Sequence, residues 1–113
     1  MVLPVTMQRS ESGKVRHAQW LGRSGRHYDL LVESLDHFTM TASDLYIVAK
    51  GGLPLWVGST DELVADPMSR TRCRLALDCA TEVLRLAAPA DRLSAIWDLE
   101  GAAPLVERTA QAA

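Results

Sequence analysis

The stretch Leu45–Val57, which reads LYIVAKGGLPLWV, decides the fold of this chain. Its two ends, Leu45–Ala49 and Leu55–Val57, are apolar and rich in the β-branched and aromatic residues that favour strands. Between them, Lys50–Pro54 supplies two adjacent glycines and a proline, which are typical of turns. The stretch therefore predicts a β-hairpin. Its nearly continuous apolar character indicates a strand pair that is buried on both faces or central in a sheet.

A second, more polar hairpin is expected earlier in the chain. Side chains alternate in character along Lys14–Leu21 and again along His27–Val32. Gly22–Gly25 lies between these segments and has the composition of a turn. The segment Glu33–Thr41 is ambiguous, because Ser34 could cap one helical turn within it.

Helical signals begin at Ser59, which has Glu62 three residues later and so forms a capping-box pattern. Asp66 and Pro67 then predict the N-cap and the first residue of a longer helix, which should run to about Ala88. The expected buried stripe of this helix comprises Cys73, Ala76, Leu77, Ala80, Val83, Leu84 and Ala87.

Pro89 ends the predicted long helix, and Asp91 opens a short one that carries Leu93, Ile96 and Trp97. Strands followed by helices, without regular alternation, predict an α+β fold with an antiparallel sheet. We expect about four strands packed against one long and one or two short helices. The whole chain, residues 1–113, is predicted to form a single domain with flexible ends at about 1–12 and 102–113.

Composition narrows the classes of function. The chain has 113 residues and 48% hydrophobic residues, enough for one domain with its own core. Its net charge of −2 argues against a general nucleic-acid binder, although a local basic patch remains compatible with it. No apolar stretch is as long as a membrane helix requires, and Met1–Met7 is too short for a signal peptide. We therefore expect a cytoplasmic protein without a membrane partner.

The Leu45–Val57 hairpin and the capped helix after it resemble a known family. Tyr46 and Trp56 are ten residues apart, and Val57-Gly58-Ser59 follows the second aromatic residue. Over about residues 44–82 this arrangement is similar to the GIY-YIG nuclease domain, which is named after short motifs on the two strands of a hairpin.

The resemblance implies metal-assisted phosphodiester cleavage, in which a tyrosine helps to generate the nucleophile, an arginine steadies the phosphate and a glutamate holds the metal. Tyr46 matches the tyrosine, and Arg70 and Glu82 are the candidates for the other two roles. The chain departs from the family at two positions. Trp56 replaces the second tyrosine, and an indole N–H group can only donate a hydrogen bond. The family's helical arginine is missing from Val64–Pro67. The resemblance thus favours a degenerate, nucleic-acid-binding relative over an active nuclease.

A small-anion site is a further alternative. Arg23 and Arg26 in the first turn, together with Arg70 at the start of the long helix, could surround a phosphate or carboxylate. Trp56 is included among these candidate ligand-binding residues. The competing interpretation is a solvated charged helix face.

The interface candidates are Trp20 and Tyr28 of the first hairpin, for which burial in the core is the alternative. The three histidines do not supply enough converging ligands for zinc, and no glycine-rich phosphate loop is present, so we expect neither a metal nor a cofactor. The preferred interpretation is a non-enzymatic interaction or assembly domain that forms a homo-oligomer, with another protein as a possible partner.

Overall fold

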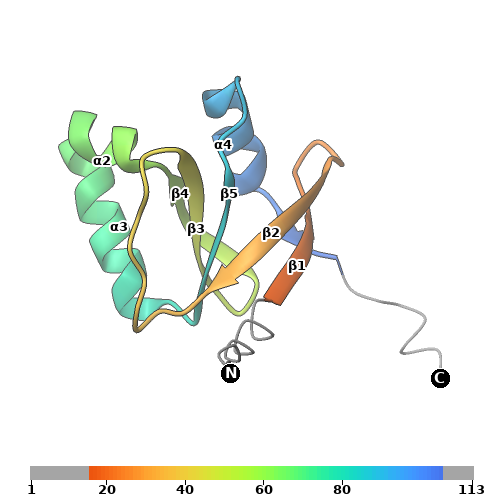
Figure 1. Ribbon diagram of the computed structural model, residues 1–113, viewed down its shortest axis with the longest axis horizontal. Helices are drawn as coiled ribbons and strands as arrows, with labels where there is room; N and C mark the ends of the chain where they lie inside the picture. Colours follow the sequence, from red (N-terminus) through yellow and green to blue (C-terminus); the bar gives the residue numbers. More distant parts are fainter. Residues whose placement is uncertain (1–15, 106–113) are drawn as a thin grey trace, which may run out of the picture.

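The computed structural model describes residues 16–105 (Figure 1). This part of the chain forms one six-stranded antiparallel sheet and three helices, which confirms the α+β class. The expected number of about four strands is wrong. The elements in chain order are β1 (Arg16–Leu21), β2 (His27–Glu33), β3 (Asp44–Lys50), β4 (Leu53–Gly58), α2 (Thr60–Ala65), α3 (Pro67–Cys79), β5 (Glu82–Ala87), α4 (Arg92–Glu100) and β6 (Ala103–Pro104).

Strand β5 is the main departure from the sequence-based expectation. The predicted long helix ends at Cys79, and the segment expected to be its second half forms a strand between β3 and β2. Val83 and Leu84 are both fully buried, but Val83 belongs to the cluster under α3 and Leu84 to the cluster under α4. A strand that is covered on both faces needs apolar side chains at consecutive positions, and such a run can imitate a helical stripe.

The Leu45–Val57 hairpin is confirmed as β3 and β4. Its two-residue loop is formed by Gly51 and Gly52, which have positive φ angles of 55° and 84°. Strand β3 is buried along nearly its whole length, whereas β4 lies at the outer edge of the sheet. The pairing shifts between Val48 and Ala49, and this irregularity leaves Leu55 without a partner on β3.

The first hairpin, β1 and β2, is also confirmed, and β5 joins it to the second one in the order β4-β3-β5-β2-β1-β6. Helices pack on both faces of the sheet around β3, β4 and β5, whereas β1 and β2 keep exposed side chains on the face opposite α4. Helix α4 packs on the face that carries Ile47 and Leu84, and α3 packs on the opposite face, which carries Tyr46 and Val48. In Figure 1, α3 and α4 accordingly lie apart, with strands between them.

The predicted helix starts are confirmed. Ser59 and Glu62 form a capping box at α2, and the Asp66 carboxylate accepts a hydrogen bond from the Met68 N–H at the start of α3. Asp91 accepts from the Ser94 N–H in the same way at α4. These caps depend on residues only a few positions apart, so the sequence pattern alone was sufficient to locate them.

The ambiguous segment after Glu33 and the expected flexible tail are the two remaining parts of the sequence-based prediction. Residues 34–43 form turns and bends without a helix, so the possible helical turn after Ser34 is not formed. Ala102 is buried and β6 pairs with β1, which makes the first part of the expected flexible tail a part of the fold. The expected flexible segments 1–12 and 106–113 lie outside the described residues.

We predict that Leu84→Ala lowers the free energy of unfolding by about 2–5 kcal/mol, because it leaves a cavity at the centre of the sheet. The matched control is Leu53→Ala in β4, whose side chain is 62% exposed and should change the stability by about 0.5 kcal/mol or less. Urea unfolding measures both variants. Equal, small effects at the two positions would contradict the central placement of β5.

Candidate functional site

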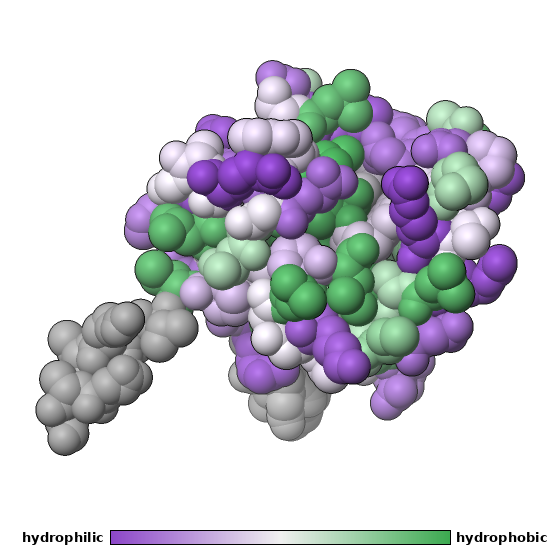
Figure 2. Space-filling model, turned by 180° about the vertical axis from the view of Figure 1, so that it is seen from behind, coloured by the Kyte–Doolittle hydropathy of each residue, from purple (hydrophilic) through white to green (hydrophobic). Residues whose placement is uncertain are grey.

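A cleft runs along the outer edge of β4, between α3 on one side and α4 on the other. It encloses a cavity of about 380 Å³, and a second hollow of about 270 Å³ continues beside α3 next to Leu55, Leu75 and Cys79. We call the two together the edge cleft. On the back of the molecule, hydrophobic surface alternates with hydrophilic surface (Figure 2). The larger cavity is lined by Pro54–Val57 of β4, by Glu62 and Asp66, by Ser69 and Arg72 of α3, and by Leu93, Ile96 and Glu100 of α4.

One wall of the edge cleft is tied to β4 by a buried hydrogen bond. The Trp56 indole N–H donates to the Ser69 hydroxyl oxygen at 2.9 Å. Gly58 permits this arrangement, because a Cβ atom at that position would lie 2.6 Å from the Trp56 ring. The bond fixes the first turns of α3 against the edge strand. It also gives Trp56 a structural partner within the fold.

The other wall is tied to α2 by Arg92, the first residue of α4. Its guanidinium group lies 2.9 Å from the Glu62 carboxylate and 3.3 Å from that of Asp61. Burial raises the pKa of Glu62, but hydrogen bonds from Ser59 and Arg92 outweigh it and hold the pKa below its ordinary value. Glu62 is therefore ionised at neutral pH. It takes part both in the capping box of α2 and in the ion pair with Arg92 of α4.

Exposed leucines and three charged side chains without an ion pair give the edge cleft its chemical character. Leu55, Leu75 and Leu93 are 37%, 58% and 65% exposed. Asp66, Arg72 and Glu100 are also exposed, and none of them makes an ion pair within residues 16–105. No group of three or more His, Cys, Asp or Glu side chains in this part of the chain is arranged to hold a metal ion. The lining is thus suited to apolar contact framed by complementary charges.

The three residues singled out by the nuclease resemblance each have a different partner. Tyr46 is fully buried, and its hydroxyl oxygen accepts a hydrogen bond from the Thr41 N–H at 2.7 Å. Arg70 donates to the Leu63 carbonyl of α2 at 2.8 Å. Glu82 stands at the start of β5, where a helical position was expected, and accepts from the Gly52 N–H at 3.0 Å. All three side chains thus have local structural contacts.

The arginines of the predicted anion site are divided between two regions. Arg23 and Arg26 lie in the β1–β2 turn, where their guanidinium groups stand 4.3 Å from the Trp97 ring centre and 5.8 Å from that of Tyr28. Arg70 lies on α3 and contacts α2. The structure brings the first two together and gives the third separate partners.

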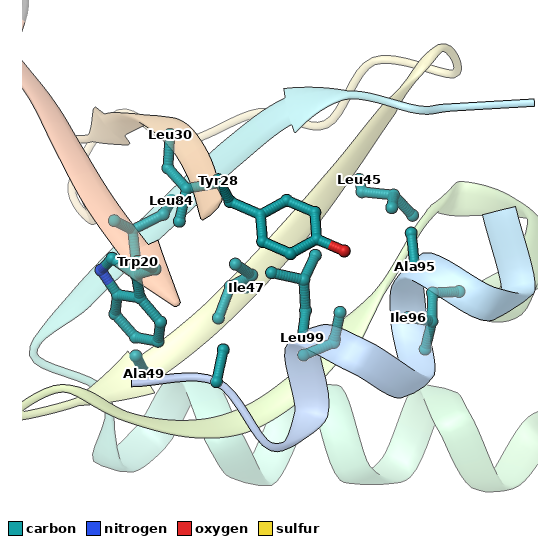
Figure 3. Packing of buried hydrophobic residues seen from close by; sticks show 12 residues of the cluster. Trp20, Tyr28, Leu30, Leu45, Ile47, Ala49, Leu84, Ala95, Ile96 and Leu99 are labelled. Carbon is teal, nitrogen blue, oxygen red and sulfur yellow. The ribbon is translucent and has the colours of Figure 1, made fainter. Parts of the chain in front are cut away.

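The predicted interface residues lie in the core. Trp20 is 2% exposed and Tyr28 is 7% exposed, and Figure 3 shows both rings among side chains of the sheet and α4. Of the two interpretations of Trp20, the single chain has the one in which it is buried in the core, because α4 covers this face of the hairpin. Periodicity placed Trp20 on one face of its strand but could not identify what covers that face.

A buried carboxylate that the sequence analysis missed clamps the β1–β2 turn to α4. Asp98 is 5% exposed and accepts hydrogen bonds from the Tyr28 hydroxyl at 2.7 Å, the Ser24 hydroxyl at 2.9 Å and the Ser24 N–H at 2.6 Å. Gly22 allows the close approach, because its Cβ atom would lie 2.5 Å from an Asp98 oxygen. The available sequence signal was the position of Asp98 three residues after Ala95, on the face that α4 buries.

The charged state of Asp98 is stabilised by its neighbours. Burial raises the pKa of Asp98, but the hydrogen bonds from Tyr28 and Ser24, with a contribution from Arg26, outweigh it and lower the pKa below its ordinary value of 3.8. Burial and the neighbouring Asp98 in turn raise the pKa of Tyr28. With every donor directed at the carboxylate, this cluster has a structural role.

No protein-family model, curated protein or solved structure matches this chain. Within residues 16–105, no helix has both the length and the apolar character that a membrane crossing requires.

We predict that Asp98→Asn lowers the free energy of unfolding by about 1–3 kcal/mol at pH 7, because two hydroxyl donors and an N–H lose a charged acceptor. The folded-state pKa lies below the unfolded one, so the contribution is present above the unfolded pKa and is lost as the pH falls through the folded pKa. The difference from the unaltered chain should therefore shrink in acid.

Urea unfolding at pH 7 and in steps below pH 4 measures this dependence. Asp36→Asn, at an exposed position in the β2–β3 connection, is the control and should have little effect at any pH. A destabilisation by Asp98→Asn that did not change with pH would contradict the clamp.

Proposed function

We propose that this chain is a non-enzymatic assembly domain that forms a homo-oligomer through the edge cleft. The observation that carries the proposal is the concentration of exposed leucines at one edge of the sheet, around the edge cleft. Leu55 projects from β4, Leu75 from α3 and Leu93 from α4, and all three line the edge cleft. Apolar surface that gathers around a hollow is typical of sites where another protein surface docks.

The two edges of the sheet support this choice. On one side, β6 pairs with part of β1 and so occupies some of that edge. On the other side, β4 has no neighbouring strand within the described chain. Removing the leucine side chains there from water would contribute about 25 cal/mol per Å² of apolar surface. Self-association through β4 and its flanking helices is therefore expected to stabilise a dimer more than association through the edge formed by β1 and β6.

The other interpretations of the sequence stay predictions. A degenerate nuclease-like domain would bind DNA in a salt-dependent manner, because contacts to phosphates release counterions. A small-anion site near Arg23 and Arg26 would lead to thermal stabilisation by phosphate. The arrangement of Tyr46, Arg70 and Glu82 adds no specific support to the first, and a cytoplasmic location and a further protein partner also stay predictions.

We predict that Leu93→Ser weakens self-association at least about tenfold, because each copy loses an apolar side chain worth about 1.5–3 kcal/mol when buried. Leu93 is exposed in the single chain, so the fold should be retained. Sedimentation equilibrium of the unaltered chain should give a mass above the 12.4 kDa of one chain.

Val64→Ser is the matched control, since Val64 is 80% exposed on α2 and does not line the edge cleft. It should leave the dissociation constant unchanged. The proposal fails if the unaltered chain sediments as a monomer at all concentrations, or if both variants weaken association equally.

A further inference from the structure

We draw no further inference here: the strongest candidate, the edge cleft between α3 and α4 beside β4, belongs to the site already described, and nothing in residues 16–105 shows which surface of a second copy, or of another partner, covers it.

Discussion

The fold depends on the pairing of β5 with two hairpins that are distant from it in the sequence. β5 hydrogen-bonds to β3 on one side and to β2 on the other, and it is the only link between the two hairpins in the strand order of the described chain. Arg85 reinforces this junction, because its guanidinium group pairs with Glu33 of β2 and, at 3.2 Å, with Asp44 of β3. Without β5 the sheet would divide into two separate ribbons, which are marginally stable in water.

This central strand also determines where the candidate site lies. Because β5 fills the middle of the sheet, β4 becomes an outer strand, and α3 and α4 are brought to opposite faces beside it. The ion pairs of Arg92 then tie α4 to α2, and the Trp56–Ser69 hydrogen bond ties α3 to β4. The cleft is thus a consequence of topology, and its exposed leucines are supplied by three elements that are not adjacent in the sequence.

The sequence predicted features whose causes are local. The Gly51–Gly52 turn and the capping residues Ser59 and Asp66 depend on neighbours a few positions away, and all were located correctly. β5 was mistaken for helix because its two buried faces give consecutive apolar residues. The Asp98 clamp depends on hydrogen bonds to Ser24 and Tyr28, about seventy positions earlier, and no local pattern encodes them. The edge cleft was missed for the same reason, since it requires the positions of α3 and α4 relative to β4.

The most direct test of self-association through the edge cleft is hydrogen–deuterium exchange of the unaltered chain at low and high concentration. Amides in β4, α3 and α4 should exchange more slowly as concentration rises, while those in β1 and β2 should not change. Exchange that is independent of concentration throughout the chain, or slowed only in β1 and β2, would contradict self-association through the edge cleft.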